Sequence, residues 1–199
     1  MKRGGAGREA GGIRSFVAVL LPEPLRARLD EAAAPLRQGA AAVSWVRAEN
    51  LHVTMRFLGG VDEGTIGRVR EALAEAAAGL APFRIVLQGF GGFPTSRTPR
   101  VVWIGVTDGG ERLGALHARV EAALARRRIP AEGRPFHPHV TLGRAREPRG
   151  AAELAERLEA PGAPLGETLV DAIHLMRSEL HPAGARYSVL AREPLRELV

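Results

Sequence analysis

The sequence predicts an α+β fold made of two pseudo-symmetric lobes. Apolar patterns with the periods of strands and helices alternate along the 199 residues in the order βαββαββαβαββ. Short strands and hairpin-length links occur together in this order, which favours an α+β arrangement over a doubly wound parallel sheet. The tripeptide His-Val-Thr occurs once in each half of the chain, at residues 52–54 and 139–141. This repeat predicts two half-chains of similar content that face each other.

The first half of the chain is expected to hold three strands and two helices. An apolar run that Pro22 ends has the character of a buried strand. Leu25 and Leu29 fall on one face of the helix that follows, and Gly79 lies near the end of a second helix whose first turn is acidic. In chain order, the strand, helix, strand, strand and helix span residues 13–21, 22–38, 42–46, 50–59 and 62–80.

The second half is expected to hold five strands and two helices. Leu113, Leu116, Val120 and Leu124 form the apolar stripe of the longer helix. The tetrapeptide His-Pro-Ala-Gly joins the last antiparallel pair of strands. In chain order, we expect strands at 83–93 and 100–106, a helix at 108–128, a strand at 136–144, a helix at 151–160, and strands at 166–180 and 185–193.

The composition narrows the class of protein. A hydrophobic content of 45% and a charged content of 25% are typical of a globular domain, and no run reaches the about 18 apolar residues that span a membrane. Residues 1–12 are Gly-rich and charged, so we expect a disordered tail, without a signal peptide, before one cytoplasmic domain over 13–199. The absence of cysteine excludes disulfides and thiol nucleophiles, and the net charge of +6 is compatible with an anionic partner.

The two His-Val-Thr strands each carry polar side chains on one face, because side chains alternate along a strand. Arg144 has the opposite parity to the second motif, so we expect that strand to end near Gly143. One such strand is ordinary, whereas two matching copies in two half-chains indicate a shared site. The residues on the polar faces are His52, Thr54 and Arg56 in the first strand, and His139 and Thr141 in the second.

Two facing imidazoles suit an in-line displacement at phosphorus. The attacking oxygen needs a base and the leaving oxygen needs an acid, and these two oxygens lie on opposite sides of the phosphorus. An imidazole has an ordinary pKa near 6.5, so one ring can be neutral while the other is protonated. Threonine hydroxyls would donate to the non-bridging oxygens, and Arg144 and Arg56 would add positive charge there.

The motifs and their surroundings resemble the 2H phosphoesterase superfamily, which is defined by two His-x-Thr/Ser motifs on two pseudo-symmetric lobes. Within it, the chain is most similar to the RNA 2′,3′-cyclic phosphodiesterase, or LigT-like, branch. The segments that carry the resemblance are RSFVAVLLP (14–22), WVRAENLHVTMRFLG (45–59), VVWIGV (101–106), RPFHPHVTLGR (134–144) and RSELHPAGARYSVL (177–190).

The resemblance implies a fold in which each lobe is an antiparallel sheet with helices on its outer side, and the lobes enclose a central cleft. It implies hydrolysis of a 2′,3′-cyclic phosphate, on RNA or a nucleotide, to the 2′-phosphate without a metal or cofactor, by a monomer that does not bind membranes. By position, His52 would be the acid for O3′ and His139 the base for water. Thr54, Thr141 and Arg144 would hold the phosphate.

Three further residues lie near the motifs. His137 and His139 have a spacing that can ligate a metal, but no carboxylate pattern accompanies them and Pro138 restricts the backbone. We therefore expect His137 at the rim of the site and no metal. Trp45 and Phe136 are the aromatic residues nearest the motifs, and each would belong to the core or stack on a base.

Other functions use the same residues. A 2′-5′ RNA ligase would run the reverse reaction and join the cyclic phosphate to a 5′-hydroxyl. A 2H phosphodiesterase of another cyclic nucleotide would differ only in its substrate pocket. A non-catalytic RNA-binding module is disfavoured, because both histidines are present.

Overall fold

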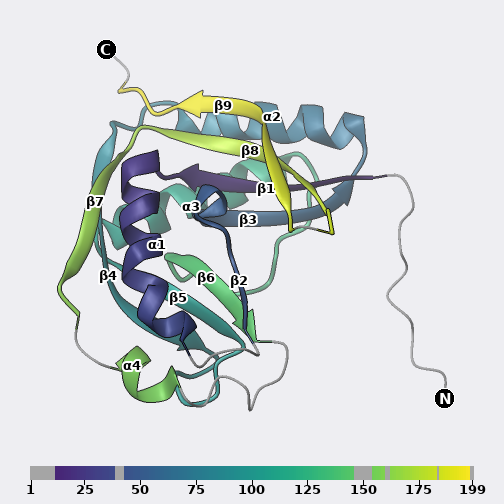
Figure 1. The fold of residues 1–199 in the computed structure, drawn as a ribbon. Helices are drawn as coiled ribbons and strands as arrows, with labels where there is room; N and C mark the ends of the chain where they lie inside the picture. Colours follow the sequence, from purple (N-terminus) through teal and green to yellow (C-terminus); the bar gives the residue numbers. More distant parts are fainter. Residues whose placement is uncertain (1–11, 39–42, 146–153, 160–161, 183, 198–199) are drawn as a thin grey trace.

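The computed structural model describes residues 12–38, 43–145, 154–159, 162–182 and 184–197, and Figure 1 shows its elements. All but one residue of the expected tail at 1–12, and parts of the expected helix at 151–160, lie outside these ranges. The elements are β1 (Ile13–Leu20), α1 (Glu23–Arg37), β2 (Val43–Trp45), η1 (Ala48–Asn50), β3 (His52–Val61), α2 (Glu63–Ala77), β4 (Phe83–Phe93), β5 (Val101–Asp108), α3 (Gly110–Arg126), β6 (His139–Ala145), α4 (Ala155–Glu159), β7 (Pro164–Val170), β8 (Ala172–Glu179) and β9 (Arg186–Pro194).

The described strands form one antiparallel sheet that is symmetric about its middle. The strand order is β7-β4-β5-β6-β3-β1-β8-β9, and β2 pairs with β6 beside this path. One lobe is therefore β7-β4-β5-β6 and the other is β3-β1-β8-β9. The two lobes meet where β3 pairs with β6 through Val53 and Val140. This confirms the α+β class and the two antiparallel lobes, which the structure joins into one continuous sheet.

The order of the strands reveals an exchange between the lobes. The first repeat runs β1-α1-β3-α2-β4, but β4 lies in the second lobe beside β5. The second repeat runs β5-α3-β6-α4 and then through β7 to β8, which lies in the first lobe beside β1. Strand β4 of the first repeat thus belongs to the second lobe, and strand β8 of the second repeat belongs to the first lobe. This exchange connects the two halves of the chain through the sheet.

This exchange corrects the expectation of one strand over 166–180. The chain forms β7 against β4, and then leaves that lobe at Asp171 to form β8 against β1. The crossing is held in place because the backbone N–H of Leu195 donates to the carbonyl of Asp171 at 2.8 Å. The Asp171 carboxylate also pairs with Arg192 at 2.8 Å. The apolar alternation continues across the break, so the sequence pattern does not reveal it.

Strand β6 also differs from its expected bounds of 136–144. It begins at His139, since Pro138 has no N–H to donate to a neighbouring strand. It does not end near Gly143 but continues to Ala145, with a bulge on the way. Thr141 pairs with Trp103 and Gly143 pairs with Val102, which leaves Leu142 as the extra residue. That residue reverses the parity of the strand after it.

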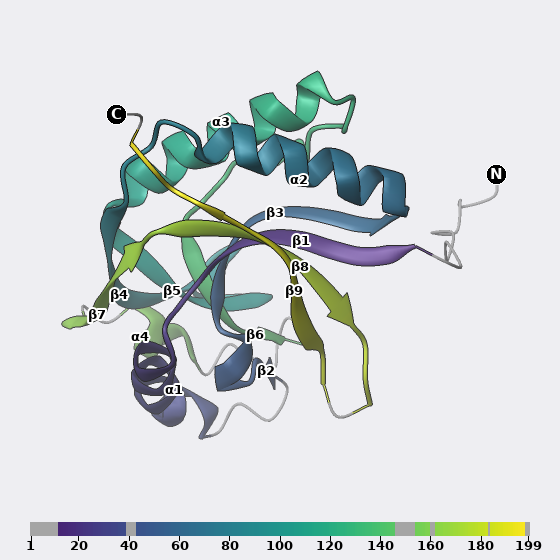
Figure 2. The same cartoon turned by 90° about the horizontal axis from the view of Figure 1, so that it is seen from above.

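The helices cover the sheet and bury one continuous apolar core. Figure 2 shows α2 and α3 side by side along one side of the sheet, with α1 and α4 on the other. Asp62 caps the start of helix α2, because its carboxylate accepts from the backbone N–H of Thr65 at 2.6 Å. Its buried stripe includes Ile66, Val69 and Leu73. None of the described helices is long and apolar enough to cross a membrane.

Candidate active site

The two His-Val-Thr motifs meet at the centre of the sheet. Val53 of β3 pairs with Val140 of β6, and both valine side chains are fully buried. Because the strands are antiparallel, one step along the register brings His52 toward Thr141 and Thr54 toward His139. Each imidazole therefore has a hydroxyl from its own strand on one side and a hydroxyl from the opposite strand on the other.

Equivalent bulges follow both motifs. In β3, Thr54 pairs with Ala18 and Arg56 pairs with Val17, which leaves Met55 as the extra residue, as Leu142 is in β6. A bulge reverses the alternation, so the residue three positions after each threonine returns to the motif face. That residue is Arg144 in β6 and Phe57 in β3. The sequence analysis placed Arg144 on the wrong parity and missed Phe57, because a bulge is set by the partner strand.

Backbone carbonyls fix the orientation of both imidazoles. Nδ1 of His52 lies 2.7 Å from the carbonyl oxygen of Asn50, and Nδ1 of His139 lies 2.6 Å from that of His137. A carbonyl only accepts, so Nδ1 carries the hydrogen in both rings, and Nε2 of each neutral ring keeps a lone pair. Nε2 of His52 is 3.0 Å from Oγ1 of Thr54. Nε2 is thus the nitrogen that accepts or donates a proton in each ring, and in neutral His52 it accepts a hydrogen bond from the Thr54 hydroxyl.

Aromatic rings surround each imidazole and lower its pKa by excluding water. The ring of His52 lies 4.9 Å from that of Phe16 and 5.6 Å from that of Tyr187. The ring of His139 lies 5.1 Å from that of Phe93. Burial is the main cause of the lowered pKa of both histidines, and the positive charge of Arg144 lowers the pKa of each further. The hydrogen bonds to Asn50 and His137 oppose this shift.

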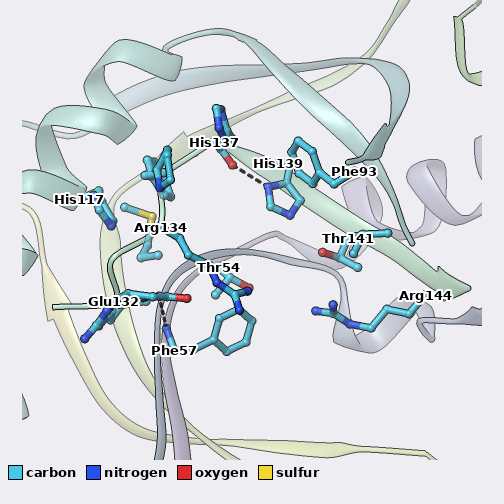
Figure 3. Close-up of a pocket in the computed structure, with 15 residues that line it drawn as sticks. Thr54, Phe57, Phe93, His117, Glu132, Arg134, His137, His139, Thr141 and Arg144 are labelled. Carbon is cyan, nitrogen blue, oxygen red and sulfur yellow. Dashed lines mark hydrogen bonds and ion pairs between the residues drawn. The ribbon is translucent and has the colours of Figure 1, made fainter. Parts of the chain in front are cut away.

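The cleft consists of two hollows that share a wall. The His139 hollow, of about 380 Å³, is shown in Figure 3, and the His52 hollow, of about 300 Å³, lies beyond the shared wall. A group held at this wall would have one imidazole on each side. The residues that line both hollows are Thr54, Phe57, Thr141 and Arg144.

The sequence predicts that Arg56 supplies charge at the phosphate; Arg56 does line the His139 hollow, but its guanidinium is engaged by two carboxylates. The bulge at Met55 turns it away from the motif face, and its side chain is only 5% exposed. Its guanidinium lies 3.2 Å from the carboxylate of Glu121 on α3 and 3.5 Å from that of Glu132, and it donates to the carbonyl of Pro130. Arg56 therefore joins β3 to α3 and to the segment that leads into β6.

The remaining candidates divide between the cleft and the core. Trp45 lines neither hollow: it packs against Gly143, and the guanidinium of Arg37 lies 5.9 Å from the centre of its ring. Phe136 and His137 both line the His139 hollow. Phe136 is stacked on His117 with their ring centres 4.3 Å apart, which occupies one face of its ring.

The sequence analysis missed two other residues of the cleft. Arg134 and Phe93 line the His139 hollow with Phe57 (Figure 3). Arg134 lies inside RPFHPHVTLGR, the segment that holds the second motif, and this position is the signal by which it could have been found. Phe93 comes from β4, and no sequence pattern links that strand to the motifs. Among the described residues, no three His, Asp or Glu side chains gather in an arrangement that could hold a metal ion.

The fold and the paired motifs define a class of protein. Residues 21–182 match the family described as the 2′-5′ RNA ligase superfamily. The match covers most of the chain, and the chain therefore belongs to this superfamily, the 2H phosphoesterases.

Individual proteins of known name or structure are similar to this chain over nearly their whole length. The chain is 40% identical over 193 residues to an RNA 2′,3′-cyclic phosphodiesterase of Thermus thermophilus, which covers 92% of this chain and 91% of that protein. It is 36% identical over 177 residues to the protein of the same name from Methanothermobacter thermautotrophicus, with 88% and 95% covered. A crystal structure of Escherichia coli LigT in complex with 3′-AMP matches with a TM-score of 0.74 at 28% identity, covering 93% of this chain and 99% of LigT.

The ion pairs of Arg56 predict a specific loss of stability. Replacement of Arg56 by Met leaves Glu121 and Glu132 without their cation, and we expect the free energy of unfolding to fall by about 3 kcal/mol. Urea denaturation followed by circular dichroism measures this change. The control is Arg84→Met, which removes an exposed pair with Glu167 and is expected to change stability little. Equal effects of the two substitutions would contradict the role given to Arg56.

Proposed function

We propose that the chain hydrolyses a 2′,3′-cyclic phosphate, on RNA or a nucleotide, to the 2′-phosphate, by acid and base catalysis from two histidines without a metal. The class of enzyme, a phosphodiesterase, follows from the superfamily and from relatives named RNA 2′,3′-cyclic phosphodiesterases. The observation that carries the two-histidine mechanism is the shared wall, which lies between His52 and His139.

The reaction begins with a water molecule on the His139 side of the phosphate. Nε2 of His139 accepts a proton from this water as its oxygen forms a bond to phosphorus. The bond from phosphorus to O3′ breaks on the opposite side, and Nε2 of His52 donates a proton to O3′. The product has a 2′-phosphate and a free 3′-hydroxyl. His139 then releases its proton and His52 regains one from solvent, which restores both rings.

The shared wall stabilises the charge that builds on the phosphate. The hydroxyls of Thr54 and Thr141 donate to the non-bridging oxygens from opposite strands, and Arg144 supplies a guanidinium. Within the described residues, Arg144 has no carboxylate partner, so its charge is available to a substrate. Phe57 is 49% exposed in the same wall and offers an apolar face to the sugar or base.

A 2′-5′ RNA ligase is the second candidate, and the name of the matching superfamily favours it. In that reaction the 5′-hydroxyl of a second RNA takes the place of water, so His139 accepts its proton and His52 again donates a proton to O3′. A 2H phosphodiesterase acting on another cyclic nucleotide would use the same wall and a different pocket. We further propose that the enzyme acts as a cytoplasmic monomer and needs no cofactor.

Product analysis tests the proposed reaction. Wild type should remain active on adenosine 2′,3′-cyclic phosphate in the presence of EDTA, since no step uses a metal. Adenosine 2′-phosphate should be the sole product, since the bond from phosphorus to O3′ is the one that breaks. His52→Ala and His139→Ala should each lower kcat/KM by at least about 100-fold, because each removes a proton-transfer group. Chromatography against 2′- and 3′-phosphate standards identifies the product. Loss of activity in EDTA that a divalent ion restores would contradict the mechanism.

The dependence of kcat/KM on pH should be bell-shaped, since one imidazole must be neutral and the other protonated. Burial lowers the pKa of both histidines most, the charge of His139 lowers the pKa of His52 further, and the charge of Arg144 lowers the pKa of both. Removing that positive charge favours the imidazolium, so Arg144→Gln should move both limbs of the profile to higher pH. The control Arg70→Gln removes an exposed arginine of α2 that lines neither hollow and should leave the profile in place. Limbs that stay fixed in Arg144→Gln would show that the profile reports other groups.

A further inference from the structure

The His52 hollow carries a concentration of positive charge that the hydrolysis of one phosphate does not require. Two arginines line it, Arg14 and Arg144, and no described Asp or Glu does. Among the described residues, neither guanidinium has a hydrogen-bond or ion-pair partner. Arg144 belongs to the shared wall. Arg14 lies at the far end of the hollow, on a different strand, and has no part in the mechanism above.

Strand register places Arg14 on the cleft side. It has the same parity as Phe16, whose ring contacts that of His52. Across the strand pair Arg14 faces Gly60, which has no side chain to obstruct it. On its other side, the register that pairs Ser15 with Arg177 brings Arg14 beside Ser178 one step further on.

Two hydroxyls complete this end of the hollow. Ser178 pairs directly with Tyr187, and both line the hollow with Arg14. Burial raises the pKa of the Tyr187 hydroxyl, and the charges of Arg144 and Arg14 oppose that shift, so both guanidinium groups lie within electrostatic reach of this oxygen. Arg14, Ser178 and Tyr187 therefore form a row of hydrogen-bond donors across β1, β8 and β9. A guanidinium flanked by hydroxyls is the donor set that binds phosphate oxygens.

The other hollow has a different character. Phe57, Phe93 and Phe136 line the His139 hollow, and the carboxylate of Glu132 lies among them. Arg134 also lines this hollow, and the Glu132 carboxylate pairs with Arg56, so the feature that distinguishes the hollow is its three phenylalanines, which suit an aromatic base. Arg14, Ser178 and Tyr187 line only the His52 hollow, on the side where the proposed mechanism places the leaving O3′.

We infer that Arg14, Ser178 and Tyr187 form a second phosphate subsite, which binds the phosphate attached to the 5′-oxygen of the nucleotide that carries the cyclic phosphate. This inference rests on the proposed function and deepens it. A nucleoside 2′,3′-cyclic phosphate with a free 5′-hydroxyl lacks this group, whereas the end of an RNA chain always has it. The subsite therefore selects RNA ends and 5′-phosphorylated nucleotides over simple cyclic nucleosides.

Equilibrium binding of two product analogues tests the subsite without turnover. Calorimetry compares adenosine 2′-phosphate with adenosine 2′,5′-bisphosphate, which differ only in the 5′-phosphate. In the wild type the 5′-phosphate should tighten binding about tenfold, as expected for a charge-assisted contact. In Arg14→Gln this gain should fall to about twofold or less. The matched control is Arg70→Gln, which removes one positive charge from the exposed side of α2 and should retain the full gain.

The binding results test the subsite, and turnover tests the proposed function. Equal affinity of the wild type for the two nucleotides would overturn the subsite, and so would a gain that survives in Arg14→Gln. A gain that Arg14→Gln loses and Arg14→Lys partly retains would support it. Failure of the proposed function is seen separately, as the absence of turnover of both adenosine 2′,3′-cyclic phosphate and its 5′-phosphorylated form, whatever the two product analogues show in the binding experiment.

Discussion

The pairing of Val53 with Val140 is the contact on which the rest of the site depends. It is the point where the two lobes join, and both side chains are completely excluded from solvent. An antiparallel pair centred on the middle residue of each motif relates the motifs by a local twofold axis. The axis places one imidazole at each end of the pair and a hydroxyl beside each. A shift of one strand by one residue would turn its polar side chains toward the core, so burial of the two valines also fixes the catalytic geometry.

The bulges after the motifs turn a symmetric frame into an asymmetric site. They bring Arg144 to the motif face in one lobe and Phe57 to the equivalent place in the other. One half-site thus supplies charge for a phosphate, and the other supplies an apolar surface. The same bulge turns Arg56 toward Glu121 of α3 and Glu132 of the segment before His139, and its ion pairs join the two. Two adjacent residues of β3 therefore differ in role: Phe57 faces the cleft, and Arg56 supports the structure around it.

Much of the fold and part of the candidate site could be predicted from the sequence, because local patterns determine them. The order of elements, the two lobes and the four motif residues follow from apolar periodicity and from the repeated tripeptide. The errors arose where distant segments decide the outcome. The break at Asp171 depends on which strand each side pairs with, and the bulges depend on the register of β1 and β5. The position of Arg56 depends on carboxylates more than 60 residues away, at Glu121 and Glu132.

The most direct test of the opposite roles of His52 and His139 uses a cyclic substrate in which sulfur replaces O3′. A thiolate leaves without a proton, so this substrate needs a base for water but no acid. The account predicts that His52→Ala recovers most of the wild-type rate on the sulfur substrate while His139→Ala remains inactive. Recovery in His139→Ala alone would reverse the two roles. Recovery in neither variant would contradict acid catalysis by a histidine of this cleft.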